Sequence, residues 1–186
     1  MPNITHAYVG LGSNLGDRAG NLLLALRGML EANLRVARLS SVYETEPIGV
    51  TTAQPFFLNM VAELALDAGE TPARPSPEQL LARLLRIEYQ LGRRRTVPLA
   101  ARAIDLDLLL YGDARAATGY LTLPHPRLHL RRFVLAPLCE LAPRALHPTL
   151  GRSFAALLSE LSDASVVERW TPAGGRKGLS ESEIFN

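Results

Sequence analysis

Two aspartates, Asp105 and Asp107, are separated by a single residue within the otherwise apolar segment 104–110. Alternate side chains of a β-strand share a face, so both carboxylates point the same way, about 6.7 Å apart along the strand. The even-numbered residues Ile104, Leu106, Leu108 and Leu110 then point together into a core. Strands contain few aspartates, and neighbouring carboxylates on one face repel each other unless a cation lies between them.

Two interpretations of the aspartate pair stay open at this point. Magnesium is commonly held by one or two carboxylates together with substrate phosphates, which favours a metal site. Alternatively, the strand is half exposed and its aspartates are solvated or paired with nearby arginines. The arginine-rich segment 93–102 ahead of the strand, and the segment with His125 and Arg131 after it, favour the metal site.

The elements that position this pair follow the order strand, helix, strand, strand, helix, strand. Periodicity predicts strands over 6–11, 36–43, 57–66 and 104–110, and helices over 17–32 and 76–92. Ser76, Pro77 and Gln79 match an N-cap, a first-turn proline and a capping box. This order is that of a ferredoxin-like α+β sandwich, a βαββαβ core in which helices cover one face of an antiparallel sheet.

The remaining chain adds extra C-terminal elements to that core. The pattern predicts a helix that ends near Leu141, a short helix over 153–161 and a strand over 166–170. We expect residues 1–170 to form a single domain, and residues 171–186, which are rich in glycine, serine and charge, to form a flexible tail.

Glycines near the N-terminus raise the possibility of a phosphate-binding loop. Gly10, Gly12 and Gly16 are spaced one residue too widely for the dinucleotide fingerprint, and no Gly-Lys-Ser/Thr follows. The sequence favours a tight turn that needs positive φ, followed by a helix cap.

Composition limits the class of protein. Hydrophobic residues make up 47% and charged residues 20% of 186 residues, which is ordinary for a soluble enzyme or binding domain. A net charge of +2 does not provide the basic field typical of nucleic-acid binding. Cys139 is the only cysteine, and no stretch of about 20 apolar residues occurs. We expect a cytoplasmic monomer with small-molecule ligands, and neither a membrane nor nucleic acid as partner.

Taken together, these residues resemble the 6-hydroxymethyl-7,8-dihydropterin pyrophosphokinase family of folate biosynthesis. The resemblance extends from Ala7 to about Trp170. It rests on six blocks in the family's order and spacing: Gly12-Ser13-Asn14-Leu15, Tyr43-Glu44-Thr45-Glu46-Pro47, Phe57-Leu58-Asn59, Gly92-Arg93, Arg102-Ala103-Ile104-Asp105-Leu106-Asp107 and Leu123-Pro124-His125-Pro126.

The resemblance implies a reaction and a set of site residues. The family moves the β,γ-diphosphate of ATP onto the hydroxymethyl oxygen of the reduced pterin and releases AMP. By resemblance, Asp105 and Asp107 coordinate two Mg²⁺ ions and act in catalysis with Arg93 and Arg102. The implied ATP contacts are Glu88, Arg93, Arg95, Arg102, Leu108, Thr122, His125 and Arg131. The implied pterin contacts are Thr45, Ile48, Phe57, Asn59 and Phe133.

Structural roles, without any ligand, remain as alternatives for several of these residues, and other functions remain for the whole site. Without the resemblance, His125 is a surface histidine between prolines, and Phe57 and Phe133 are core residues. The pair of aspartates also suits another magnesium-dependent nucleotidyl- or phosphotransferase. Ferredoxin-like sheets also carry RNA-binding domains, which stack bases on aromatic residues of the central strands. Asp105 and Asp107 would repel an RNA backbone, which disfavours that function.

Overall fold

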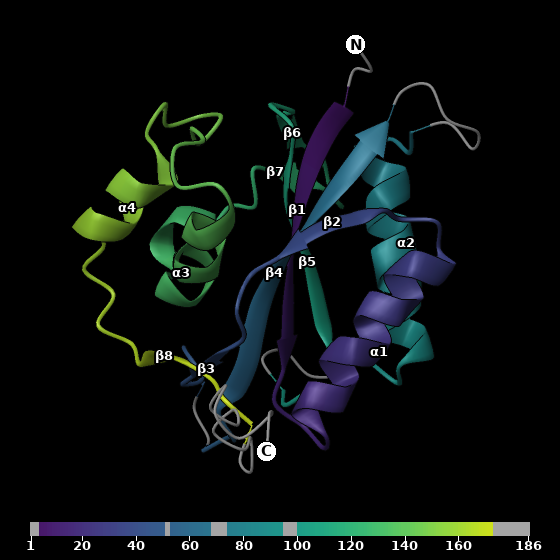
Figure 1. Ribbon diagram of the computed structural model, residues 1–186, viewed down its shortest axis with the longest axis vertical. Helices are drawn as coiled ribbons and strands as arrows, with labels where there is room; N and C mark the ends of the chain where they lie inside the picture. Colours follow the sequence, from purple (N-terminus) through teal and green to yellow (C-terminus); the bar gives the residue numbers. More distant parts are fainter. Residues whose placement is uncertain (1–3, 51–52, 68–73, 95–99, 173–186) are drawn as a thin grey trace, which may run out of the picture.

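The computed structural model describes residues 4–50, 53–67, 74–94 and 100–172, which form three layers (Figure 1). An antiparallel sheet lies between helices α1 and α2 on one face and α3 and α4 on the other. The elements are β1 (Ile4–Ser13), α1 (Arg18–Glu31), β2 (Val36–Leu39), β3 (Tyr43–Thr45), β4 (Phe57–Asp67), α2 (Pro77–Gln90), β5 (Asp105–Tyr111), β6 (Ala116–Ala117), β7 (Thr122–Leu123), a 3-10 turn (Leu128–Leu130), α3 (Arg132–Leu141), α4 (Phe154–Glu160) and β8 (Val167–Arg169).

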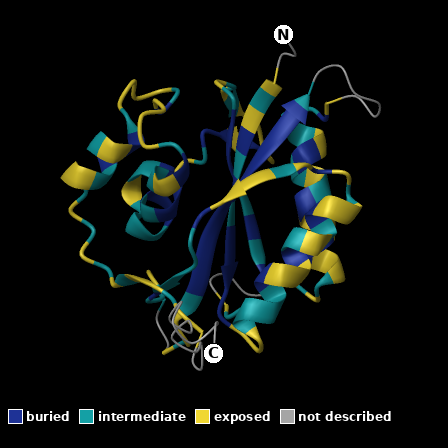
Figure 2. Ribbon diagram, viewed as in Figure 1, coloured by how far each residue is buried: buried dark blue, intermediate teal, exposed yellow. Residues whose placement is uncertain are grey.

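The sheet has the order β5-β1-β4-β3-β8, and β2 also pairs with β4. Every pairing in it is antiparallel. The central strands β1 and β4 are largely buried, whereas β2 and the outer faces of the helices are exposed (Figure 2). The mixed α and β composition and the antiparallel sheet are therefore as predicted.

Two hydrophobic cores hold the layers together. Leu106 and Leu108 point into the core beneath α1 and α2, as their alternation predicts. Leu110 does not join them, so that part of the prediction is wrong. A shift of register between Tyr8 and Val9 places both Leu109 and Leu110 in the second core, beneath α3. A β-bulge of this kind adds one residue to a strand and reverses the alternation beyond it.

Local signals account for most element boundaries. Ser76 caps α2 in a capping box with Gln79, as predicted, and Gly92 follows the helix with a φ of 87°. The predicted strand over 36–43 is wrong as a single element, because β2 ends at Leu39 and β3 begins at Tyr43. Between them the Ser40 hydroxyl accepts the Val61 N–H, a ladder position that a regular strand would fill with a backbone carbonyl.

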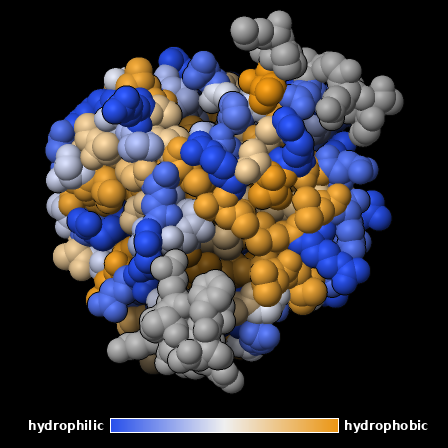
Figure 3. Space-filling view, viewed as in Figure 1, coloured by the Kyte–Doolittle hydropathy of each residue, from blue (hydrophilic) through white to orange (hydrophobic). Residues whose placement is uncertain are grey.

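The outer surface carries apolar side chains over α1 and β2 (Figure 3). The exposed apolar residues of these two elements are Leu23, Leu24, Leu30 and Leu39. None of the described helices combines the length and apolar character needed to cross a bilayer.

Candidate functional site

The floor of the site is a strip of bare backbone on β1. In the sheet register Asp105 lies opposite Gly12, and Asp107 lies opposite Gly10. On the other side of β1, Gly12 lies opposite Asn59. Because neither glycine has a side chain, only backbone lies between the carboxylates of β5 and the polar groups of β4. Gly10 and Gly12 therefore lie within the strand, whereas Gly16 has the predicted positive φ and Asp17 caps the helix that follows.

A cavity opens above this floor, between the sheet and the start of α3, and is called the aromatic cavity below. It brings together residues that are far apart in sequence, including all five that were predicted to contact a pterin. Its predicted members are Thr45, Ile48, Phe57, Asn59, Arg102, Asp105, Asp107, Arg131 and Phe133.

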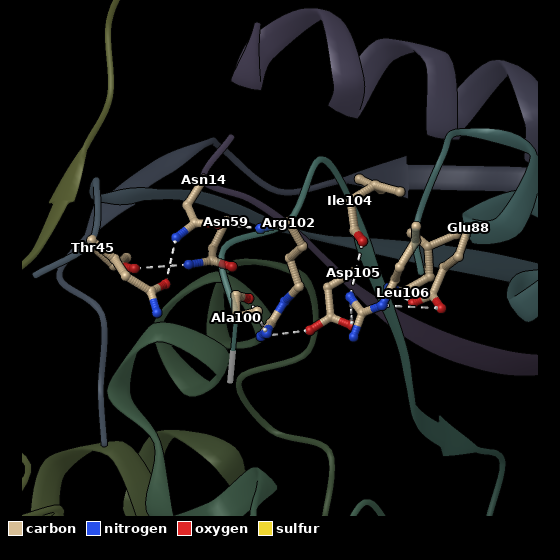
Figure 4. A network of polar contacts seen from close by, with 11 residues as sticks. Asn14, Thr45, Asn59, Glu88, Ala100, Arg102, Ile104, Asp105 and Leu106 are labelled. Carbon is tan, nitrogen blue, oxygen red and sulfur yellow. Dashed lines mark hydrogen bonds and ion pairs between the residues drawn. The ribbon is translucent and has the colours of Figure 1, made fainter. Parts of the chain in front are cut away.

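One wall of the aromatic cavity carries a buried amide. Asn59 and Thr45 are only 8% and 1% exposed, and the Asn59 Nδ2 group donates to Thr45 Oγ1 at 2.7 Å (Figure 4). This bond fixes the side-chain amide, so its oxygen is held in one direction. An oriented amide in a cavity that also has apolar walls is suited to recognising one hydrogen-bonding edge of a flat ligand.

Each of the two predicted aromatic residues is accompanied by an arginine. The guanidinium carbon of Arg102 lies 5.2 Å from the centre of the Phe57 ring, and that of Arg131 lies 5.4 Å from the centre of Phe133. Phe57 and Phe133 are both half-buried, and Phe133 also packs against the second core. These are cation–π distances, so the aromatic cavity combines apolar surface with positive charge.

Asp105 is held by two arginines. Its carboxylate pairs with Arg93 at 2.5 Å and with Arg102 at 2.8 Å (Figure 4). The Arg93 guanidinium also donates to the Ile104 carbonyl at 2.9 Å. Arg93 and Arg102, the two arginines that were predicted to act in catalysis, thus converge on one of the two carboxylates, at the start of β5.

Asp107 differs from Asp105 in its surroundings. Within the described part of the chain it forms no ion pair, and burial, followed by the charge of Asp105, raises the pKa of its carboxyl to about 6. Arg131 partly opposes this rise. A carboxylate in this position is stabilised by any cation that approaches it, because burial and the neighbouring charge both penalise its ionised form.

A second depression lies between α2 and β7 and is called the α2–β7 groove below. Asp107 lines both this groove and the aromatic cavity, so the two meet at its carboxylate. The groove combines apolar side chains from α2 with polar groups from β7 and the loop beyond it. The residues lining it that were predicted to contact ATP are Glu88, Arg93, Leu108, Thr122 and His125.

Glu88 has a structural role in this groove. It is 2% exposed, and its carboxylate accepts the Leu106 N–H at 2.7 Å and lies 3.6 Å from the Arg93 Nε (Figure 4). It therefore fixes β5 to α2 at the point where the aspartates begin. Glu88, a predicted ATP contact, is thus a buried carboxylate with partners in the protein.

His125 follows β7 on the same groove. Burial and the charges of Arg131 and Arg127 lower the pKa of its imidazole to about 4, so the ring is neutral at pH 7. Its backbone N–H donates to the Leu109 carbonyl at 2.9 Å, which ties the loop to β5. Its Nδ1 accepts the Arg127 N–H at 3.3 Å, so the other ring nitrogen of the neutral imidazole is the donor. His125 is therefore not the free surface histidine of the alternative interpretation.

Asn14 was not singled out from the sequence, but it holds the loop that carries Arg102. Its side-chain oxygen accepts the Arg102 N–H at 2.8 Å, and its own N–H donates to the Arg102 carbonyl at 3.1 Å. Its amide donates to Gln54 at 3.0 Å, so it also reaches the loop before β4. Only its place in the Gly12-Ser13-Asn14-Leu15 block signalled it. Arg95, a predicted ATP contact, lies outside the described residues.

The donor set fits magnesium better than a transition metal. Among the described residues, no group of three or more histidine, cysteine, aspartate or glutamate side chains is placed to hold a metal ion. Two carboxylates on one strand face, beside arginines and open space, suit a hard cation that takes its remaining ligands from water and substrate phosphates.

Comparison with known proteins agrees with this geometry. A family model described as 7,8-dihydro-6-hydroxymethylpterin-pyrophosphokinase (HPPK) matches residues 8–143. A 2-amino-4-hydroxy-6-hydroxymethyldihydropteridine pyrophosphokinase of Synechocystis is 36% identical over 96% of this chain and 88% of its own length. The protein of the same name from Bacillus subtilis is 42% identical over 76% of this chain and 79% of its own length.

Some relatives are longer, fused proteins. The mitochondrial folate synthesis bifunctional protein of Pisum sativum is 34% identical over 95% of this chain, which spans only 32% of that protein. Crystal structures of HPPK-DHPS share the fold. One, in complex with substrates, gives a TM-score of 0.65 at 13% identity and covers 86% of this chain and 43% of its own. Another, from Plasmodium falciparum, gives a TM-score of 0.62 at 14% identity and covers 85% of this chain and 45% of its own. The family model matches most of the chain, the shorter relatives are similar over most of their length, and the cavity and groove meet at Asp107. The chain belongs to the 7,8-dihydro-6-hydroxymethylpterin-pyrophosphokinase family.

Proposed function

We propose that this chain catalyses the reaction of its family: transfer of the β,γ-diphosphate of ATP to the hydroxymethyl group of 6-hydroxymethyl-7,8-dihydropterin, with release of AMP, in folate biosynthesis. The observation that carries the proposal is that Asp107 lines both the aromatic cavity and the α2–β7 groove. A pterin in the cavity and ATP in the groove would present the attacking hydroxyl and the diphosphate to the same carboxylate.

The aromatic cavity is suited to the pterin. Phe57 on β4 and Phe133 on α3 both line it, and a flat ring bound there would stack on these two aromatic side chains. The amide of Asn59, fixed by Thr45, recognises the hydrogen-bonding edge of that ring. Ile48 closes the cavity from the loop after β3.

The α2–β7 groove is suited to the nucleotide. Leu108 and the apolar side chains of α2 contact the base and ribose, with Glu88 and Thr122 beside them. The triphosphate runs toward Asp107, with His125 beside the α-phosphate and Arg131 beside the β,γ-diphosphate. We include Arg95, which precedes β5, as a further phosphate contact.

The magnesium site consists of Asp105 and Asp107, and we propose two ions. Bound there, the ions supply charge neutralisation of the triphosphate and lower the pKa of the attacking hydroxyl. Arg93 and Arg102 neutralise Asp105 in the ligand-free protein. When phosphate arrives, the same guanidinium groups can exchange a carboxylate for a phosphate partner, and so stabilise the charge that moves onto AMP.

Phosphoryl transfer depends mainly on positioning and on charge stabilisation. The chain supplies both without a covalent intermediate, because the site residues hold the pterin hydroxymethyl group and the β-phosphate in line. His125, neutral at pH 7, donates a hydrogen bond and adds no charge.

We further infer the finer features that accompany this function. The strand order β5-β1-β4-β3 with β2 beside β4 supports a ferredoxin-like βαββαβ core, extended by α3, α4 and β8. Residues 1–170 would act as one domain and 171–186 as a tail. The protein would work as a monomer in the cytoplasm, with ATP and the pterin as its only partners.

A mass-spectrometric assay tests the function. The chain is incubated with ATP, Mg²⁺ and 6-hydroxymethyl-7,8-dihydropterin, with Asp107→Asn as the inactive control. The expected products are AMP and the pterin diphosphate in equal amounts. ADP with a monophosphorylated pterin would instead support another magnesium-dependent phosphotransferase, and no pterin product at all would refute the proposal.

A further inference from the structure

The aromatic cavity is built from two walls that belong to separate parts of the chain. Phe133 and Arg131 come from the start of α3, whereas Thr45 and Asn59 come from β3 and β4. The width of the cavity therefore depends on how α3 is held against the β3 side of the sheet. Below α3 the apolar core fixes the depth of this packing, but apolar contacts alone allow a helix to slide or rotate.

Glu140, in the last turn of α3, provides a directional contact with that side of the sheet. Its carboxylate accepts three hydrogen bonds of 2.6 Å, from the Tyr43 hydroxyl, the Ser41 N–H and the Arg169 guanidinium. Tyr43 and Arg169 lie directly opposite each other in the β3–β8 ladder. One side chain of α3 thus ties together β8, β3 and the connection before β3.

The position of these partners links Glu140 to the ligand-binding residues. Tyr43 lies opposite Asn59 in the sheet and two residues before Thr45, on the same strand face. On the helix, Glu140 follows Phe133 by seven residues, which is two turns and about 10 Å along the same side of α3. A movement of Glu140 relative to Tyr43 would therefore change the separation of Phe133 from Asn59 and Thr45.

The two ends of α3 are anchored differently. At the start of the helix, the Arg132 N–H donates to the Asp163 carboxylate at 2.8 Å, and the Arg132 side chain donates to the Asp163 carbonyl. That contact joins α3 to the segment after α4. Glu140 is thus the polar tie between α3 and β3 at the opposite end of the helix, and its side chain is 23% exposed. Burial by itself would raise the pKa of Glu140, but the hydrogen bonds from Tyr43, Ser41 and Arg169 lower it to about 2, so the tie stays charged at neutral pH.

We propose that Glu140 is a positioning residue that sets the width of the aromatic cavity and thereby the affinity for the pterin. The proposal rests on the proposed function, because it takes the pterin as the ligand of that cavity. Glu140 touches neither the aromatic cavity nor the α2–β7 groove. Arg131, which we place beside the diphosphate, also lies at the start of α3, so removal of Glu140 should weaken ATP binding much less than pterin binding.

The test compares Glu140→Ala, Glu140→Gln and Tyr43→Phe with Glu160→Gln. Glu160 is a matched control, because it is an acidic helix residue paired with an arginine, Arg152, away from both sites. Calorimetry measures the Kd of the pterin in the presence of a non-hydrolysable ATP analogue and the Kd of the analogue alone. Steady-state assays give KM and kcat, and thermal unfolding reports stability.

We expect Glu140→Ala to raise the Kd and KM of the pterin about 10- to 100-fold, with a smaller fall in kcat and a clearly smaller rise in the Kd of the ATP analogue. Glu140→Gln, which keeps the length and one acceptor oxygen, should recover part of the affinity. Tyr43→Phe removes one of the three donors and should show a smaller rise of the same kind. This variant keeps the test decisive if Glu140→Ala does not fold.

Two results would overturn the proposal. In the first, the Glu140 variants fold but unfold at a lower temperature, and they bind the pterin with the same Kd as Glu160→Gln. Glu140 would then only stabilise the fold. The other is an equal loss of pterin and ATP affinity. Both presuppose that the unaltered protein binds and converts the pterin; if it does not, the proposed function itself fails, and this inference fails with it.

Discussion

A single added methyl group at Gly12 provides a stringent test of how the pterin site is built. A Cβ placed on Gly12 would lie 2.6 Å from the Asn59 side-chain oxygen, whereas ordinary contact begins at 3.4 Å. The Asn59 amide would therefore have to move by about 0.8 Å. It cannot do so without weakening its 2.7 Å bond to Thr45 in a wall that is almost fully buried.

The free-energy cost of Gly12→Ala follows from the hydrogen bond between Asn59 and Thr45. Leaving a buried polar group without its partner costs about 1–3 kcal/mol. The displaced amide would also face the ligand in the wrong direction. For Gly12→Ala we therefore expect a loss of about 1.5–3 kcal/mol in pterin binding, or about 10- to 150-fold in Kd.

The assay is calorimetric titration of the pterin in the presence of Mg²⁺ and an ATP analogue, with the analogue titrated separately. Gly10→Ala is an informative comparison, because its Cβ would meet Leu109 at 3.6 Å, an ordinary contact, so a smaller loss is expected. Gly119→Ala is the neutral control, because nothing lies within 4 Å of its Cβ. Wild-type pterin affinity in a folded Gly12→Ala protein would refute the assigned roles of Gly12 and Asn59.

Three further predictions concern charge and capping. Asp107→Asn should abolish diphosphate transfer without lowering the unfolding temperature, because it removes a buried carboxylate that Asp105 repels; parallel loss of activity and of the folded state would contradict a role in metal binding. The depressed pKa of Glu140 gives stability that is complete above its ordinary pKa of 4.5 and is lost as the pH falls toward 2. Urea unfolding should therefore show a larger deficit for Glu140→Gln at pH 6 than at pH 3, and a deficit independent of pH would disprove the charged tie. Ser76→Ala removes the cap of α2 and should cost about 1 kcal/mol, or about 2–4 °C in Tm, with unchanged kinetics; an unaltered melting curve would show that the cap contributes nothing.

The parts of the fold that depend on local signals could be predicted from the sequence. The Ser76 and Gln79 capping box and the apolar period of α2 determine where that helix begins and which side is buried. Alternation along β5 likewise placed Asp105 and Asp107 on one face. These features are encoded within one or two turns of chain, so they need no knowledge of the neighbouring elements.

The features that depend on pairing between distant strands could not be predicted. The bulge that turns Leu110 toward α3 arises from the register of β5 on β1, and the break before Tyr43 arises from the bond of Ser40 with Val61. The role of Gly12 depends on the same kind of information. A glycine in a strand signals close approach only when its neighbours across the sheet are known.

The site shows the same division between residue type and geometry. Motifs identified Asp105 and Arg93, and pairing of the aspartates with nearby arginines stayed open as an alternative; the structure shows that pairing for Asp105. Glu140 carried no signal at all, because its partners are distant in the chain: Tyr43 and Ser41 lie 97 and 99 residues earlier, and Arg169 lies 29 residues later. Such long-range contacts fix the dimensions of a cavity, which residue types alone do not specify.

The most direct measurement is a crystal structure with Mg²⁺, a non-hydrolysable ATP analogue and the pterin. We predict magnesium about 2.0–2.1 Å from carboxylate oxygens of Asp105 and Asp107, with the β- and γ-phosphates as further ligands. Arg93 should then contact phosphate. Magnesium bound away from both carboxylates, with the pair between Arg93 and Asp105 intact, would contradict the proposed chemistry.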